Sequence, residues 1–260
     1  MTKVKARQVT FKLQRYDPEQ DDSPHFQEFR VPASRGMTVL DGLIYIKETE
    51  DSSLTFRASC RMGICGSCAI FVNNYPYLAC QTQLEELGSD RLMIKPLPNL
   101  PVIKDLVIDL TSFFDAHQSI KPYLIGHDKE EMENPTSEFV QTPQELNEIL
   151  QFTNCIKCGI CLSACPTSAS DELFLGPGTI SQCYRYCADN RDDGERERSP
   201  VVAADHGIWH CHLAGACSEA CPKGVDPALA IQLLKRRLVS QALKPGRKQK
   251  PASVKPHHQS

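Results

Sequence analysis

Apolar and polar residues alternate near the beginning of the chain. Val9, Phe11 and Leu13 stand between polar neighbours, as expected for a strand with one buried face. A turn-rich stretch at 17–24 separates this segment from a second expected strand at 25–31. The pattern therefore predicts a pair of strands at the start of the fold.

A helix is expected to begin at Thr38. Asp41 follows three residues later, which is the spacing of a capping box. Leu40, Leu43 and Ile44 recur at helical spacing and are expected on its inner face.

Strand patterns return on both sides of a loop rich in cysteine. The loop spans 60–68, one strand is expected at 69–72 and another around 92–94. Short strands, one helix and a loop that carries metal ligands predict a small α+β domain over residues 1–100.

Pro96, Pro98 and Pro101 indicate a change of organisation. Apolar residues then recur at helical spacing and predict a packing helix: Ile103, Leu106, Val107, Leu110 and Phe114. Residues 128–138 are acidic and polar, so we expect a solvated loop there. Residues 101–141 are accordingly assigned to a connecting helix and a polar loop.

The following region, residues 142–243, has the pattern of a helical domain. The segment TPQE at 142–145 supplies an N-cap, a proline at the first helical position and a capping-box glutamate. The residues expected on the inner face of this helix are Leu146, Ile149 and Leu150. Further helices are expected over about 177–189 and from Asp226 onward.

Composition fits two globular domains. The chain has 260 residues, of which 41% are hydrophobic and 23% charged, and its net charge of −3 gives no reason to expect nucleic-acid binding. No apolar run reaches the roughly 18 residues of a membrane helix, and the N-terminus lacks a long apolar signal. We therefore expect a cytoplasmic chain. Residues 244–260 are basic and proline-containing, which predicts a disordered tail.

Cysteine is the residue type that changes this picture. The chain contains 13 cysteines, and in a reducing compartment dense cysteine indicates metal ligation rather than disulfides. Most of them fall into three ordered groups, which scattered core cysteines would not do.

The first group is Cys60, Cys65 and Cys68, with Cys80 after a gap. C-x4-C-x2-C followed by a distant cysteine is the plant-type 2Fe–2S spacing. Gly63 and Gly66 are expected to let the loop turn its backbone N–H groups toward the sulfurs. A zinc knuckle is the alternative, although zinc knuckles usually bring two tight cysteine pairs.

The second group is a complete C-x2-C-x2-C-x3-C-P run at 155–166. In two-cluster ferredoxins the last cysteine of such a run ligates the other cluster. Cys155, Cys158 and Cys161 should therefore hold one cluster, while Cys165 should reach its neighbour.

The third group repeats this run with one member replaced. Cys211, Cys217 and Cys221 are in register, but Ala214 stands where the second cysteine belongs. By the same exchange, Cys221 completes a four-thiolate set with Cys155, Cys158 and Cys161, which predicts a 4Fe–4S cluster. Cys165, Cys211 and Cys217 remain as three ligands, which predicts a 3Fe–4S cluster.

Four further residues near these groups have less specific patterns. Cys183 and Cys187 are four residues apart on an expected helix and are interpreted as buried, inert thiols. His210 and His212 flank Cys211, where they are either ordinary loop histidines or groups that tune a potential or handle protons.

Five segments carry a family resemblance: CRMGICGSC, VIKDLVIDL at 102–110, KPYLIG at 121–126, CIKCGICLSACP, and CSEACPKGVDP at 217–227. Together they resemble the iron–sulfur subunit of the complex II family, succinate dehydrogenase and fumarate reductase, over roughly residues 5–240. The resemblance implies an α+β chain: an N-terminal β-grasp 2Fe–2S ferredoxin-like domain, then an all-α ferredoxin-like domain holding 4Fe–4S and 3Fe–4S.

The resemblance also implies partners. They are a flavoprotein subunit with covalent FAD, membrane anchor subunits that often bind haem b, and quinone. The subunit would pass single electrons between FAD and quinone and perform no bond chemistry on the dicarboxylate. It would lie on the cytoplasmic face of a bacterial inner membrane, held by the anchors.

By resemblance, the quinone-side wall includes Pro166, Thr167 and His212. Many succinate dehydrogenases carry a tryptophan where this chain has Ser170. The forms CRMGICGSC and IWHC favour fumarate reductases, whereas His212 favours succinate dehydrogenases. The balance leans toward a menaquinone-linked enzyme, and the direction of the reaction is not determined by this chain.

Two alternatives remain from the sequence. One is a carrier subunit of another flavin-linked oxidoreductase, which would usually have two complete cysteine runs. The other is a zinc-stabilised binding module.

Overall fold

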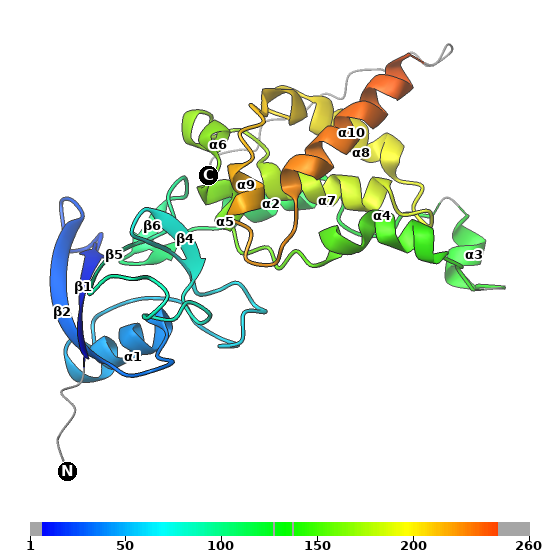
Figure 1. The fold of residues 1–260 in the computed structure, drawn as a ribbon. Helices are drawn as coiled ribbons and strands as arrows, with labels where there is room; N and C mark the ends of the chain where they lie inside the picture. The colour runs from blue at the N-terminus through cyan, green and yellow to red at the C-terminus, as the bar shows by residue number, and fades with distance from the viewer. Residues whose placement is uncertain (1–6, 127, 137, 244–260) are drawn as a thin grey trace.

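A computed structural model describes residues 7–126, 128–136 and 138–243. They form a sheet domain followed by a helical domain (Figure 1). The disorder expected for the tail at 244–260 lies outside the described residues.

The sheet domain contains five strands in the order β2-β1-β5-β3-β4. They are β1 (Arg7–Arg15), β2 (His25–Ala33), β3 (Ala69–Val72), β4 (Tyr75–Leu78) and β5 (Arg91–Lys95). β1 is parallel to β5 and antiparallel to β2, and β3 is antiparallel to β4 and β5. This mixed sheet agrees with the expected β-grasp fold, and each strand expected in the domain is confirmed. The sequence reading missed β4, an edge strand that tolerates Pro76.

Helix α1 (Val39–Thr49) packs on this sheet. The capping box expected at its start is present, since Thr38 and Asp41 each accept a hydrogen bond from the other's backbone N–H. A Cβ added to Gly42 would lie 2.4 Å from the Cζ atom of Phe11. Glycine therefore allows the helix to approach a core strand closely.

The packing helix predicted across residues 103–114 is wrong. The chain forms a two-stranded hairpin, β6 (Val102–Lys104) and β7 (Val107–Ile108), and only then helix α2 (Thr111–Ser119). Between the strands, Asp105 has φ +46°, which an α-helix does not accommodate. Its buried carboxylate accepts hydrogen bonds from Arg15 Nε, at 3.0 Å, and from the N–H groups of Tyr16 and Thr55. These contacts fix the turn against the sheet domain.

Helices build the rest of the described chain. They are α3 (Lys129–Glu133), α4 (Pro143–Thr153), α5 (Ile160–Ser163), α6 (Pro166–Ser170), α7 (Pro177–Cys187), α8 (Glu195–Ala203), the 3₁₀ helix η1 (Ile208–His210), α9 (Ala216–Glu219) and α10 (Pro227–Ala242). α7 is central, because it contacts α2, α4, α5, α8 and α10. Three expected helices are confirmed: the one that starts at 142–145, the one over about 177–189 and the one that starts at Asp226.

Two details of the helical region correct the sequence reading. Within 128–138, the residues whose burial the structure describes are mostly exposed, but the segment includes α3, whose start is capped by Asp128. In α4, Leu146 and Leu150 are exposed, whereas Ile149 and Phe152 are buried. The inner face is rotated because Phe152 packs edge-on against Tyr184 of α7.

The two domains meet through α5 and α9, which lie beside the sheet domain in Figure 1. Asn99 donates to the backbone carbonyls of Leu162, Ser163 and Cys165 at 3.1–3.3 Å. On the α9 side, the Tyr75 hydroxyl donates to the carbonyl of Glu219 at 3.0 Å. The loops that carry the second and third cysteine groups are therefore tied to the first domain.

Candidate metal centres

The first-domain site consists of Cys60, Cys65, Cys68 and Cys80. Three backbone N–H groups, of Met62, Ile64 and Cys65, donate to Cys60 Sγ at 3.3–3.5 Å. Gly63 and Gly66 have φ values of +70° and +74°, so the glycines adopt the left-handed conformation that this wrapping requires. The loop conformation expected around the sulfurs is therefore present.

The thiols of this site differ in their surroundings. Hydrogen bonding, first from the Ser67 hydroxyl, lowers the pKa of Cys65 to about 6. Burial, together with the neighbouring Cys80, raises the pKa of Cys68 to about 12. A bound cation would allow Cys68 to ionise, because a metal stabilises the thiolate.

The inner site consists of Cys155, Cys158, Cys161 and Cys221. All four line one cavity of about 30 Å³, closed by apolar residues that include Phe113 and Val225. Burial, with added repulsion from the thiolates of Cys155 and Cys221, raises the pKa of Cys158 to about 11. Cys221 is thus a close neighbour of the earlier run, although 60 residues separate it from Cys161 in the sequence.

The outer site consists of Cys165, Cys211 and Cys217, which line a separate cavity of about 20 Å³. Ala214 lies in the wall of the same cavity. Burial raises the pKa of Cys217 to about 11, and the charges of Cys165 and Cys211 add to the shift. The cysteines of the two runs therefore line two cavities, and each cavity contains cysteines from both runs.

The donor chemistry fits iron–sulfur clusters. The first-domain and inner sites each offer four sulfurs, and the outer site offers three sulfurs with a methyl group beside them. Burial raises the pKa of Cys68, Cys158 and Cys217, so bound iron is the positive charge that would keep these thiols ionised together with their neighbours. The assignment of each ligand remains a prediction.

The first-domain and inner sites face each other across the domain contact. A Cβ added to Gly66 would lie 2.8 Å from Cys158 Cβ. A cavity of about 310 Å³ between the domains is lined by residues of both loops, among them Cys65, Ser67 and Lys157. Sequence reasoning missed this close approach, because no spacing rule relates a glycine of one loop to a cysteine of another.

The residues expected on the quinone side lie together. Pro166 and Thr167 line the outer site, and Thr167 Oγ1 accepts a weak hydrogen bond from the His212 backbone N–H at 3.5 Å. Ser170, on the same short helix, donates to the carbonyls of Pro166 and Thr167. Their contact with quinone stays a prediction.

The two remaining cysteines and the two histidines that flank Cys211 have different neighbours. Cys183 and Cys187 are buried in α7 with their sulfurs 3.8 Å apart, which agrees with the expected buried thiols. The His210 side chain contacts Asp171 together with His206, whereas the His212 backbone contacts Thr167. Sequence reasoning missed Asp171 and His206, because they are 35 residues apart and lack a recognisable ligand spacing.

Comparisons with known proteins agree with this architecture. A family model described as a 2Fe–2S iron–sulfur cluster binding domain matches residues 10–115, and one described as a 4Fe–4S dicluster domain matches residues 151–225. Neither is a zinc module.

Relatives are similar over most of their length. The chain is 47% identical to the fumarate reductase iron–sulfur subunit of Mycobacterium tuberculosis (strain CDC 1551 / Oshkosh), covering 91% of this chain and 95% of that protein. It is 44% identical to the subunit of the same name from Haemophilus influenzae, with 84% and 88% covered. The succinate dehydrogenase iron–sulfur subunit of Paracoccus denitrificans is 37% identical, with 89% and 88% covered.

A solved structure has the same fold. A chain of the Mycobacterium smegmatis Sdh1 complex in the apo form superposes with a TM-score of 0.82 at 24% identity, covering 92% of this chain and 99% of that one.

Proposed function

Because the chain belongs to the iron–sulfur subunits of the fumarate reductase and succinate dehydrogenase family, we propose that it carries single electrons between the FAD of a flavoprotein subunit and quinone in the membrane. When bound, iron–sulfur clusters supply one-electron redox chemistry. The observation that supports this function most directly is the distribution of the cysteine runs over two cavities.

We assign the ligands by these groupings. Cys60, Cys65, Cys68 and Cys80 hold a 2Fe–2S cluster. Cys155, Cys158, Cys161 and Cys221 hold a 4Fe–4S cluster, and Cys165, Cys211 and Cys217 hold a 3Fe–4S cluster. Ala214 has no atom that can ligate iron, so the outer site lacks a fourth ligand from the chain.

The chain would orient and shield these clusters. Backbone N–H groups donate to Cys60 Sγ, and such donors stabilise the added negative charge of a reduced cluster. Apolar residues and the domain contact exclude water from the inner site. Gly66 keeps the loops of the first-domain and inner sites in contact.

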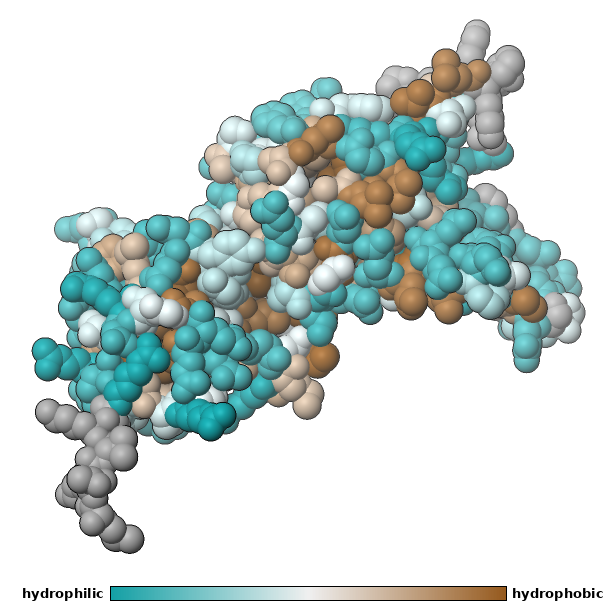
Figure 2. All heavy atoms as spheres, viewed as in Figure 1, coloured by the Kyte–Doolittle hydropathy of each residue, from teal (hydrophilic) through white to brown (hydrophobic). Residues whose placement is uncertain are grey.

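The outer site would face quinone. Pro166 and Thr167 line it, and the backbone of His212 is linked to Thr167. Exposed apolar side chains occur around these segments, among them Leu173, Trp209 and Leu213. Figure 2 shows more hydrophobic surface on the helical domain than on the sheet domain. The exposed side chains of Leu173, Trp209 and Leu213 suit contact with anchor subunits.

The partners are also part of this proposal. In the part of the chain that the structure describes, no helix is both long and apolar enough to cross a bilayer. We infer attachment to the cytoplasmic face of a bacterial inner membrane through anchor subunits, with covalent FAD in the flavoprotein subunit. The family resemblance also implies haem b in the anchors. We favour menaquinone as the quinone.

Purification of the complex from native membranes tests the function. The expected result is a brown complex with covalent FAD, hydrophobic partner subunits and separate 2Fe and 3Fe electron paramagnetic resonance (EPR) signals. A soluble, flavin-free protein that contains zinc instead of iron would contradict it and favour the zinc-stabilised module. Iron without a membrane partner would favour another flavin-linked carrier.

A further inference from the structure

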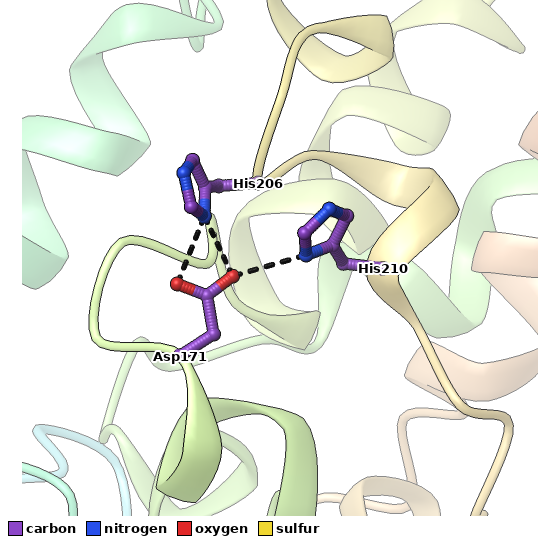
Figure 3. Close-up of side chains that lie close together, drawn as sticks. All are labelled: Asp171, His206 and His210. Carbon is purple, nitrogen blue, oxygen red and sulfur yellow. Dashed lines mark hydrogen bonds and ion pairs between the residues drawn. The ribbon is translucent and has the colours of Figure 1, made fainter.

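One group of potential metal ligands contains no sulfur. Asp171, His206 and His210 bring a carboxylate and two imidazoles together, with one ligand atom from each within 4.8 Å of the others (Figure 3). His206 Nδ1 lies 2.9 and 2.8 Å from the two oxygens of Asp171, and His210 Nδ1 lies 3.1 Å from Asp171 Oδ2. We propose that these three side chains form a binding site for a divalent transition metal such as Zn²⁺.

The spacing of the ligand atoms suits such an ion. Zinc binds nitrogen and carboxylate oxygen at roughly 2.0–2.2 Å, so tetrahedral ligand atoms lie about 3.3 Å apart. The separations of His206 Nδ1 and His210 Nδ1 from Asp171 Oδ2 are 2.8 and 3.1 Å, so only small side-chain movements would be needed to place an ion between them. Two imidazoles select zinc and its neighbours in the transition series over Mg²⁺ or Ca²⁺, which prefer oxygen.

The backbone holds the three side chains in place. Asp171 Oδ1 accepts from the Leu173 N–H at 3.0 Å, which fixes the carboxylate at the end of α6. His206 has φ +61°, and its carbonyl accepts from the Leu175 N–H at 3.0 Å. A Cβ added to Gly207 would lie 2.2 Å from the Val202 carbonyl oxygen, so the turn between the histidines is tightly confined.

Solvent can reach the site. The side chains of His206 and His210 are 40% and 48% exposed, while that of Asp171 is 17% exposed. An ion could therefore enter, and water would fill its remaining coordination position. To bind it, each imidazole would present an unprotonated Nδ1, with its proton on Nε2.

A metal here would join two segments of the helical domain. Asp171 directly follows α6, which begins after Cys165, and His210 directly precedes Cys211. The ion would connect the two loops that carry ligands of the outer site. The proposal itself does not depend on iron–sulfur clusters or on electron transfer.

Zinc binding to the purified complex tests the site. Complex treated with EDTA and then dialysed against ZnCl₂ should bind one Zn²⁺ that is lost or weakened in the Asp171→Asn variant. Removing a residue that only supports a ligand already costs 10–100-fold in affinity, so loss of this ligand should weaken binding at least about tenfold. Asp21→Asn is the matched control, because Asp21 faces His25 at 3.7 Å on the sheet domain and, within the part of the chain that the structure describes, belongs to no group of three such ligands.

The ligand set is checked by zinc K-edge X-ray absorption on the wild-type complex, which needs no variant to fold. Two imidazoles with oxygen ligands and no sulfur are expected. A sulfur shell, the absence of stoichiometric binding, or unchanged affinity in Asp171→Asn would overturn the proposal. If Asp171→Asn does not assemble, His206→Gln and His210→Gln give the same test at exposed side chains. A failed zinc site alongside intact EPR signals would leave the proposed electron transfer standing.

Discussion

At the residue scale, the proposed composition of the outer site depends on one methyl group. Ala214 lies in the cavity wall beside Cys165, Cys211 and Cys217. It occupies the position that holds a cysteine in the earlier run. Since a cluster of four irons needs a ligand for each, this side chain accounts for the predicted difference between the inner and outer sites.

Ala214→Cys is expected to restore the missing ligand. The EPR signal of a 3Fe cluster should disappear in the oxidised complex, and a second 4Fe centre of lower reduction potential should replace it. Ala214→Val, which adds volume without a ligand, should keep the 3Fe signal. An unchanged 3Fe signal in Ala214→Cys would show that the register of this loop is wrong.

At the element scale, local signals predicted the elements that they control. The capping boxes at Thr38 and Thr142 are present in the structure, since they depend only on residues three apart. The cysteine spacings likewise led to groupings that the structure brings together. These signals are local because each arises from neighbouring backbone and side-chain groups.

Elements fixed by distant contacts could not be predicted. The hairpin at 102–108 has helical periodicity, but its turn at Asp105 is held by Arg15, 90 residues away. The short helices α5 and α9 each have four residues and were missed, since a single turn leaves too few positions for periodicity. The group of Asp171 with His206 and His210 forms only when two loops meet.

A buried ion pair connects helix α8 to another part of the helical domain. The side chains of Arg198 in α8 and of Asp192 are both fully buried, with Nη1 and Oδ1 2.6 Å apart. Arg198 also donates to the carbonyls of Ile120, Lys121 and Tyr123. The pair therefore ties α8 to the segment after α2.

Asp192→Asn should destabilise the protein by about 3–5 kcal/mol, because it leaves the Arg198 charge buried without its partner. The exposed pair of Arg7 and Asp90 has the same 2.6 Å separation and is the control. Asp90→Asn should change stability by less than about 1 kcal/mol. Thermal unfolding of both variants measures the difference in stability. Equal unfolding temperatures for Asp192→Asn and Asp90→Asn would contradict the account.

At the scale of the whole molecule, the three candidate sites lie one after another in space, with the inner site between the other two. The first-domain and inner sites meet at Gly66 and Cys158, and the inner and outer sites share the two cysteine runs. The proposed electron path through these sites therefore requires a close contact between the domains.

Gly66→Ala should disturb this contact. The added Cβ would lie 2.8 Å from Cys158 Cβ, which is too close for two carbon atoms. Alanine at this positive φ also costs roughly 1 kcal/mol of stability. Gly36→Ala is the control, since Gly36 has φ +76° but no atom within 4 Å of the added Cβ. Electron transfer to quinone should fall in Gly66→Ala and stay near wild type in Gly36→Ala. Equal activities would show that the contact is not needed.

The central claim is that each cysteine run gives its last sulfur to the other run's cluster. EPR spectroscopy of the complex carrying Cys165→Ser, compared with Cys221→Ser, tests it most directly. The account predicts that Cys165→Ser alters the 3Fe signal and spares the 4Fe signal, while Cys221→Ser does the reverse. If Cys165→Ser alters only the 4Fe signal, each run closes on its own cluster and the account is wrong.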